Sequence, residues 1–222
     1  MLSMKKKVIL ADDHALIRLG LSSFVSNHPK YEIISSVNNG KECIELFTEN
    51  IYDLAILDIE MPILNGVETA RWIKANSPHT NIMFITSHAS LHDFYQALQL
   101  DVAGFLFKEN AMEEIETALN RIAKGQQYIS PKCNHFVVQQ QENIAKIKEI
   151  EKKIATLSKK EREVLFHIMQ RKTTVEIADE LCNSYKTIEN HRSNICRKIE
   201  IEGNNNLLVF ALANKETIKL FL

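Results

Sequence analysis

The chain has 222 residues, of which 45% are hydrophobic, so it can bury the core of one large domain or two modest ones. No segment reaches the roughly 18 to 20 uninterrupted apolar residues of a membrane span, and the apolar run after Lys5-Lys6-Lys7 is only about five residues long, too short for a secretory signal. We therefore expect a cytoplasmic protein that has no membrane partner.

Charge is unevenly distributed along the chain, although the net charge is only −1. Residues 1–125 hold 11 Lys and Arg against 16 Asp and Glu, or −5, and residues 126–222 hold 16 against 12, or +4. This asymmetry indicates a metal or phosphate site joined to an anion-binding module. Four cysteines, at positions 43, 133, 182 and 196, form no CxxC pair and have no histidine at zinc-site spacing, which predicts free buried thiols in preference to a disulfide framework or a metal site.

Apolar runs and helix-period segments alternate through the first 125 residues. The strand-like runs are residues 8–11, 33–37, 54–57, 82–85 and 103–107, and the helical segments are about 14–26, 40–50, 66–76, 90–100 and 111–124. This alternation predicts a parallel α/β sheet with helices on both faces and right-handed crossovers. At this length we expect five strands in the flavodoxin-like order 2-1-3-4-5, which makes the first and third strands neighbours.

Acidic residues end two of these predicted strands. Asp12 and Asp13 follow residues 8–11, and Asp58 follows residues 54–57. Parallel strands bring their carboxyl ends to one edge of the sheet, so three carboxylates meet there and need a cation to offset their repulsion. An all-oxygen cluster of this kind suits Mg²⁺.

The pattern changes after residue 125. Residues 126–141 are polar and irregular, with Pro131 as a helix breaker, and residues 142–156 form an amphipathic linker helix with one narrow stripe of isoleucines, at positions 144, 147, 150 and 154. That stripe either packs on the C-terminal domain of its own chain or forms a short coiled coil between two protomers.

From Leu157 onward the chain is predicted to be helical. Ser158 and Glu161 form a capping box that opens the first helix, and two further helices, residues 174–181 and 186–199, flank a tight turn. This is the outline of a helix-turn-helix, which a fourth helix over residues 204–221 closes. The predicted domains are therefore 1–125, a linker 126–156, and a small all-α domain 157–222.

Short motifs occur in register across both halves of the chain. In the first half they are Asp12-Asp13, Leu57-Asp58, Met61-Pro62, Asn65-Gly66, Thr86 and Gly104-Phe105-Leu106-Phe107-Lys108; in the second half they are Leu157-Ser158-Lys159-Lys160-Glu161-Arg162-Glu163-Val164-Leu165, Glu176-Ile177-Ala178 and Thr187-Ile188-Glu189-Asn190-His191. Together they resemble the NarL/FixJ class of two-component response regulators, in which a receiver domain precedes a LuxR-type helix-turn-helix. The resemblance covers nearly the whole chain.

The resemblance implies that Asp58 accepts a phosphoryl group from a sensor histidine kinase. It assigns Mg²⁺ to Asp12, Asp13, Asp58 and the backbone carbonyl of Glu60. A carboxylate is a poor nucleophile toward a phosphoryl group of like charge, so the metal is needed to neutralise the phosphoryl oxygens. Lys108 would place a fixed positive charge on one phosphoryl oxygen, and the Thr86 hydroxyl would donate to another.

The resemblance also implies a switch. Thr86 moves toward the phosphoryl group, and Phe105 turns inward to fill the vacated space. Many relatives have Tyr where this chain has Phe105, and the alternative is a plain core phenylalanine. Glu60 and His88 stand at positions that tune the lifetime of the phosphoryl group in receivers; the alternative is that both are solvated loop residues.

The candidate recognition helix spans residues 187–198, beginning at Thr187. Its early outward positions Glu189, Asn190 and Ser193 are predicted to reach base edges. The predicted phosphate contacts are Lys186, Arg192, Arg197 and Lys198. An ordinary solvated amphipathic face is the alternative.

One position departs from the family pattern. Arg171 stands where the family usually has a glycine of positive φ at the end of the first output helix. Either that helix ends differently, or a non-glycine residue adopts the glycine conformation at some cost.

We conclude from the sequence that the chain is a phosphorylation-controlled transcription factor and not an enzyme. When phosphorylated, it is expected to form a homodimer on double-stranded promoter DNA. Two rival interpretations remain. Asp58-Ile59-Glu60 resembles the DxD nucleophile motif of aspartyl-phosphate phosphatases, and a degenerate receiver can act only as a protein-binding module.

Overall fold

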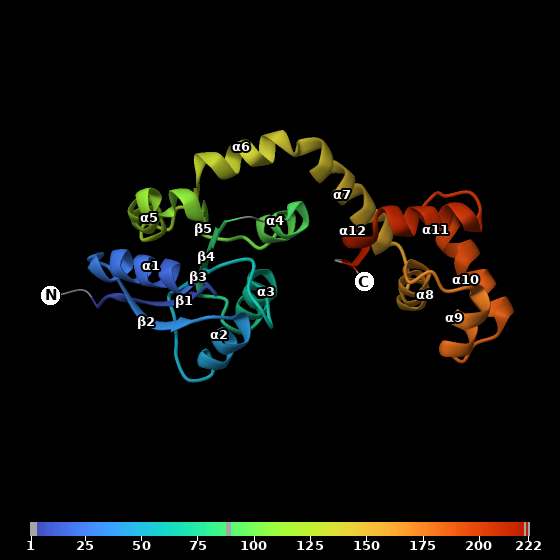
Figure 1. The fold of residues 1–222 in the computed structure, drawn as a ribbon, viewed down its shortest axis with the longest axis horizontal. Helices are drawn as coiled ribbons and strands as arrows, with labels where there is room; N and C mark the ends of the chain where they lie inside the picture. Colours follow the sequence, from blue (N-terminus) through green and yellow to red (C-terminus); the bar gives the residue numbers. More distant parts are fainter. Residues whose placement is uncertain (1–3, 88–89, 220, 222) are drawn as a thin grey trace. The chain divides into compact units, whose positions relative to one another are not determined.

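The computed structural model describes residues 4–87, 90–219 and 221. The chain forms two compact units, which divide after Gln140. The first unit is a layered α/β fold and the second is helical (Figure 1). None of the described helices is both long and apolar enough to span a bilayer.

A six-stranded parallel sheet lies at the centre of the first unit. In sheet order its strands are β2 (Tyr31–Val37), β1 (Lys6–Ala11), β3 (Leu54–Leu57), β4 (Asn81–Thr86), β5 (Gly104–Phe107) and β6 (Tyr128–Ile129). The predicted order 2-1-3-4-5 is confirmed. The two-residue strand β6 was not predicted, because so short a segment becomes a strand only through its pairing with the edge of β5.

Helices cover both faces of this sheet, as expected (Figure 1). On one face, α1 (Ala15–Asn27) and α5 (Lys108–Ile122) pack on alternate strand residues such as Leu10 and Ile56. On the other face, α2 (Gly40–Leu46), α3 (Gly66–Asn76) and α4 (Leu91–Leu98) pack on the intervening residues, such as Ile9 and Leu57. This alternation buries both faces of β1, β3, β4 and β5, which explains the apolar runs in these four strands.

The segment after β6 corrects one expectation. Pro131 does not break a helix but begins α6 (Pro131–Gln139), and the Ser130 side chain caps that helix by accepting a hydrogen bond from the Cys133 amide. Proline is well suited to the first turn, because its missing N–H would have no partner there. Phe136 and Val137 of α6 pack against the core on the α4 side of the sheet. The expectation of an irregular segment was therefore wrong.

The second unit begins with the predicted amphipathic helix, α7 (Gln141–Ala155). The other helices of this unit follow residue 157 and enclose its core: α8 (Lys159–Met169), α9 (Thr174–Glu180), α10 (Tyr185–Lys198), α11 (Asn204–Ala213) and α12 (Lys215–Lys219). Ile150 and Ile154 of α7 pack with this core, which confirms the first reading of the isoleucine stripe for these two residues. The predicted fourth helix is interrupted at Asn214 and forms α11 and α12.

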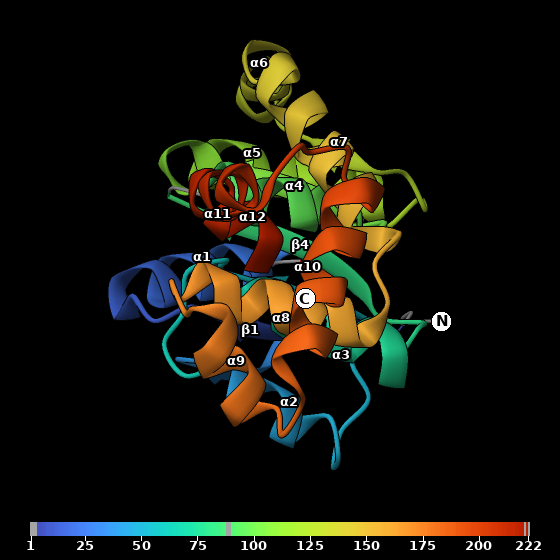
Figure 2. The ribbon, with the colours of Figure 1, turned by 90° about the vertical axis from the view of Figure 1, so that its right-hand side faces the viewer.

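Arg171 ends α8 in the left-handed conformation, with φ of 64°. The Lys172 amide donates to the His167 carbonyl across this turn, as in a Schellman motif. The helix therefore ends in the conformation that glycine adopts most easily, and Arg171 adopts it at a cost of about 1–2 kcal/mol, because its Cβ crowds the backbone there. Figure 2 shows the second unit, in which α8 and α9 both pack against α10.

Candidate functional site

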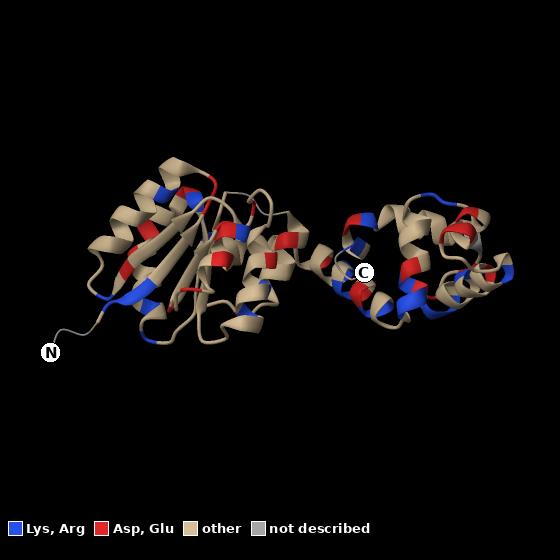
Figure 3. Cartoon of the chain, turned by 90° about the horizontal axis from the view of Figure 1, so that it is seen from below, with Lys and Arg blue, Asp and Glu red and all other residues tan. Residues whose placement is uncertain are grey.

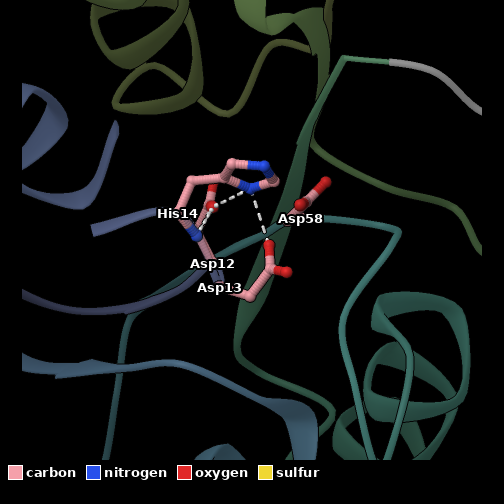
Figure 4. A group of neighbouring side chains, drawn as sticks. All are labelled: Asp12, Asp13, His14 and Asp58. Carbon is pink, nitrogen blue, oxygen red and sulfur yellow. Dashed lines mark hydrogen bonds and ion pairs between the residues drawn. The ribbon is translucent and has the colours of Figure 1, made fainter. Parts of the chain in front are cut away.

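The predicted acidic residues meet at the carboxyl edge of the sheet. Strands β1 and β3 are paired neighbours, and the Asp58 amide donates to the Ala11 carbonyl at 2.8 Å, so both strands end at the same level. Asp12 and Asp58 are almost fully buried, whereas Asp13 is partly exposed. Figure 4 shows the three carboxylates gathered in one place. The adjacency of the first and third strands thus produces the predicted cluster.

Lys108 supplies the positive charge inside this cluster. It is the first residue of α5, and its Nζ lies 2.7 Å from Asp12 Oδ2 and 2.7 Å from Asp58 Oδ2. The lysine side chain is only 5% exposed. A buried ammonium shared by two carboxylates offsets the desolvation that each carboxylate would otherwise suffer.

The ion pair with Lys108 does not fully offset the cost of burying the charge of Asp58. Burial raises the pKa of its carboxyl; the Lys108 ammonium and the Thr86 side chain lower it, and the Asp12 carboxylate raises it again, so the pKa lies above its ordinary value. Within the described part of the chain, the buried Oδ1 atom of Asp58 has no hydrogen-bond partner. A buried acceptor atom of this kind is the position at which a further cation or an incoming electrophile would be stabilised.

His14 belongs to the same cluster, although our sequence analysis did not include it. Its Nδ1 lies 2.7 Å from Asp13 Oδ1 and 3.4 Å from Asp12 Oδ1, as the dashed lines in Figure 4 mark. One ligand atom each from Asp12, Asp13, His14 and Asp58 lie within 4.8 Å of one another. The donor set fits a small divalent cation. The signal that could have found His14 is its place directly after the two aspartates.

The loop after Asp58 is held by a close backbone contact. A Cβ atom on Gly66 would lie 1.9 Å from the Asp58 carbonyl oxygen, and the Gly66 amide donates to the Ile59 carbonyl at 2.9 Å. Asn65 caps α3 by accepting from the Glu68 amide. The Asn65-Gly66 pair of the sequence motif thus lets α3 begin directly beneath the acceptor residue. In this loop the side chain of Glu60 is exposed.

The predicted switch residues end up on neighbouring strands. Thr86 is the last residue of β4, and Phe105 lies on β5; both are buried. The Phe105 ring contacts Phe94 at 4.7 Å and Phe84 at 5.8 Å between ring centroids, so it already points into the core. His88, the other residue predicted to tune the phosphoryl lifetime, lies outside the described residues.

The candidate recognition helix corresponds to α10. Ser184 caps it by accepting from the Thr187 amide, and Thr187 is partly exposed. One face of the helix presents four exposed polar side chains at spacings of four, three and four residues: Lys186, Asn190, Ser193 and Arg197. Glu189 lies beside this face and pairs with Lys186 at 2.7 Å. The structure therefore places four of the eight predicted DNA contacts on one exposed stripe.

Two of the predicted phosphate contacts lie elsewhere. Arg192 is only 9% exposed, and burial lowers the pKa of its guanidinium. Lys198 donates to Glu161 of α8 at 2.7 Å. The Arg192 side chain is thus buried in the second unit, and the Lys198 side chain pairs with α8, so neither lies on the exposed stripe. Figure 3 shows Lys and Arg interspersed with Asp and Glu over the helices of this unit.

Comparisons with known proteins agree with this geometry. The family model described as "Response regulator receiver domain" matches residues 8–120, and the one described as "Bacterial regulatory proteins, luxR family" matches residues 155–211. Response regulator protein VraR from Staphylococcus aureus (strain Mu3) is 28% identical over 205 residues, which cover 92% of this chain and 95% of that protein.

Among solved structures, the receiver domain of the putative response regulator NarL from Mycobacterium tuberculosis is 31% identical, with a TM-score of 0.52, and covers 56% of this chain and 100% of that one. A complex of the two-component response regulator RcsB with DNA has a TM-score of 0.58 at 23% identity, covering 95% of this chain and 98% of that one. A further structure of the RcsB response regulator, from Salmonella typhimurium, has a TM-score of 0.60 at 22% identity and covers 94% of this chain and 98% of that one.

The receiver fold and its acidic edge precede a helix-turn-helix in one chain, and both family models match in the same order. The chain therefore belongs to the response regulators of two-component systems, as a DNA-binding transcription factor with a receiver domain and a LuxR-type output domain.

Proposed function

We propose that Asp58 is the phosphoryl acceptor and that a phosphohistidine of a sensor histidine kinase is the donor. Asp58 Oδ1, buried and without a hydrogen-bond partner among the described residues, carries this proposal. The oxygen attacks phosphorus, the phosphorus–oxygen bond forms as the phosphorus–nitrogen bond breaks, and the nitrogen keeps the electron pair. Lys108 and Thr86, which border Asp58, would hold the oxygens of the transferred group.

Asp12, Asp13 and Asp58 are the residues that would hold Mg²⁺, with the backbone carbonyl of Glu60 as a further ligand. When bound, Mg²⁺ supplies the positive charge that neutralises the phosphoryl oxygens during transfer. Three carboxylates with one buried lysine leave two formal negative charges at this edge, which supports the assignment of a divalent cation. Glu60 and His88 are proposed to adjust the access of water to the acyl phosphate.

Residues 157–222 are proposed to bind double-stranded promoter DNA, and residues 126–156 to connect them to the receiver at 1–125. Asn190 and Ser193, with Glu189 and Thr187 beside them, would contact base edges. Lys186 and Arg197 lie at the two ends of the exposed stripe and would contact phosphates. Arg192 would instead stabilise the unit by its buried packing, and Lys198 by its ion pair with Glu161.

Phosphorylation is proposed to favour a homodimer in the cytoplasm, with two recognition helices reading related half-sites. In this proposal the chain has no catalytic turnover of its own. Multiple turnover on small phosphate esters would separate the rival interpretation, an aspartyl-phosphate phosphatase, from this proposal.

Intact mass after incubation with acetyl phosphate and Mg²⁺ tests the acceptor. Wild type is expected to gain one phosphoryl group and Asp58→Asn none, and light scattering on the same samples is expected to shift toward dimer only for wild type. Equal adducts on both proteins would contradict the assignment of Asp58. Absence of an adduct on wild type would favour the protein-binding module.

Fluorescence anisotropy with labelled duplex DNA tests the output unit. We expect binding to weaken steeply as salt rises, because cationic side chains release counterions from the phosphates. Asn190→Ala is expected to reduce discrimination between sequences, and Lys186→Ala to weaken binding to all duplexes equally. Affinity that is independent of salt would contradict DNA binding by α10.

A further inference from the structure

The histidine beside the acidic pair changes the donor chemistry of the acceptor site. Receiver chemistry as described above needs only oxygen ligands, but here an imidazole nitrogen stands among the carboxylates. The His14 ring is not buried: its side chain is 62% exposed, so packing does not account for its position. Its contacts are polar and converge on the cluster, with Asp12, Asp13 and, at 3.4 Å, Lys108 Nζ.

We propose that His14 is a nitrogen ligand of the cation at the acceptor site, and that the site consequently binds divalent first-row transition ions, with Mn²⁺ as the probe, in preference to Mg²⁺. This inference rests on the proposed function, because it places the same cation beside Asp58. It adds a residue and a selectivity that the oxygen ligands alone do not provide.

The spacing of the donor atoms supports the proposal. In an octahedral shell with bonds of about 2.1 Å, neighbouring donor atoms lie about 3 Å apart. His14 Nδ1 lies 2.7 Å from Asp13 Oδ1 and 3.4 Å from Asp12 Oδ1, which is the spacing that adjacent ligands of one ion would have (Figure 4). The ring therefore needs little movement to become a ligand together with either carboxylate.

A second observation points independently to a missing positive partner. Asp58 is 3% exposed, and its Oδ1 has no hydrogen-bond partner within the described residues, although its Oδ2 receives the Lys108 ammonium. One ammonium thus leaves one buried oxygen unsatisfied. One carboxylate oxygen of Asp58 lies within 4.8 Å of the ligand atoms of His14 and Asp13, so a cation held by these two residues would stand beside the Asp58 carboxylate and supply the missing positive charge.

The chemistry of the ligands decides which ion benefits. Mg²⁺ is a hard cation that takes oxygen ligands and keeps several waters, so an imidazole adds little to its affinity. Imidazole suits the divalent ions of iron, nickel, copper and zinc; Mn²⁺ is the weakest binder of this first-row series and also takes oxygen ligands, and it is the probe because its spin reports a bound nitrogen directly. The nitrogen of His14 is therefore expected to raise the affinity for Mn²⁺ while leaving the affinity for Mg²⁺ nearly unchanged.

Electron spin-echo modulation of bound Mn²⁺ on the full chain tests the ligand directly. We expect a nitrogen coupling in the wild type that is absent in His14→Asn, and a Mn²⁺ affinity that falls by about tenfold or more in the variant, since loss of even an outer-shell partner commonly has that effect. Mg²⁺ competition should give nearly the same Mg²⁺ affinity for both proteins. Asparagine suits this position because His14 is the N-cap of α1, and an asparagine there can cap the helix.

His79→Asn is the matched control, since His79 is an exposed histidine that precedes β4, at the opposite end of that strand from Thr86. It should leave both the coupling and the affinities as in wild type. Mn²⁺ bound without nitrogen coupling, no Mn²⁺ binding, or an unchanged ratio of Mn²⁺ to Mg²⁺ affinity in His14→Asn would overturn the proposal. The acetyl phosphate adduct, measured with Mg²⁺ on wild type and Asp58→Asn, separates the two ideas, because it tests Asp58 alone and does not depend on a nitrogen ligand.

Discussion

Lys108 Nζ lies 2.7 Å from Asp58 Oδ2, and it lies the same distance from Asp12 Oδ2. A single ammonium therefore serves two buried carboxylates that end different strands. This relationship joins the stability of the first unit to its chemistry, because the lysine that would hold the transferred phosphoryl group also makes the acidic edge tolerable before transfer.

Lys108→Met is expected to destabilise the first unit by about 3–5 kcal/mol in metal-free buffer, because it leaves two buried carboxylates without a cation. Urea unfolding followed by the fluorescence of Trp72, the only tryptophan of the chain, measures the loss. Mg²⁺ should restore part of it.

Lys132→Met is the control for that experiment. Lys132 also pairs with a carboxylate, that of Glu109, but both side chains are about half exposed or more. We expect a loss below about 1 kcal/mol. Equal losses in the free energy of unfolding for the two lysine variants would show that the buried ion pairs of Lys108 contribute no more to stability than the surface pair of Lys132.

Gly66→Ala is expected to disturb the acceptor residue itself. The added Cβ would meet the Asp58 carbonyl oxygen at 1.9 Å, and backbone cannot yield as a side chain can. The free energy of unfolding should fall by about 1–3 kcal/mol, and the yield of phosphoryl adduct by intact mass should fall with it.

Gly20→Ala provides a comparison for the glycine experiment. There the added Cβ would meet only the flexible side chain of Met112, with Cε at 2.5 Å and Sδ at 3.7 Å, and alanine is favoured in the interior of α1. Its stability should change by less than about 1 kcal/mol. A normal adduct yield on Gly66→Ala would contradict the importance of the close contact.

Phe136→Ala is expected to loosen α6. The Phe136 ring contacts Phe94 at 5.0 Å in an edge arrangement, and Phe94 contacts Phe105 at 4.7 Å. Because Phe136 is only partly buried, the loss should be about 2 kcal/mol, seen as faster hydrogen exchange over residues 131–139. Val138→Ala on the same helix removes an exposed side chain and should leave exchange unchanged. Slow exchange in Phe136→Ala would show that α6 is held by other contacts.

The second unit should lose stability in acid, because protonation of Glu161 removes a stabilising interaction. Burial acts to raise the pKa of its carboxyl, but the Lys198 ammonium and the hydrogen bonds from Ser158 outweigh burial and hold that pKa below the ordinary value of 4.5. Because the pKa is lower in the folded state, the ionised Glu161 stabilises the fold at pH values above 4.5, the ordinary pKa. This stabilisation is lost as the pH falls through the folded-state pKa.

Glu161→Gln should remove this pH dependence and reduce stability at neutral pH by about 2 kcal/mol, since a charge-assisted hydrogen bond is lost. Hydrogen exchange of α8, corrected for the intrinsic rate at each pH, is the measurement. Glu163→Gln, which removes a surface pair with Lys160, should have an effect below about 1 kcal/mol. A wild-type profile as flat as that of Glu161→Gln would exclude Glu161 as the acid-sensitive group.

The prediction from sequence was strongest where periodicity and position carry the same information. Alternating strands and helices were enough to place Asp12, Asp13 and Asp58 at one edge, and the capping box at Ser158 was confirmed in both of its hydrogen bonds. It failed at residues 126–139, because a two-residue strand has no signal of its own and Pro131 reads equally as a breaker or as a first-turn residue.

The recognition helix shows a second kind of limit. Helical periodicity places Asn190 and Arg192 about 200° apart around α10, but it does not say which direction is covered by α8 and α9. Packing buries Arg192 and leaves Asn190 exposed. Which of the predicted DNA-contacting side chains are exposed therefore depended on the neighbouring helices.

By itself the sequence determined the two-part organisation, the parallel sheet and the acidic edge, because each follows from local spacing and from the rule that parallel strands end together. Only the tertiary structure decided that Lys108 bridges Asp12 and Asp58, that His14 turns toward Asp13, and that α6 packs beside Phe94. The physical reason is that these are contacts between side chains from different elements, whose distances depend on helix placement and rotamer, and no local pattern encodes either.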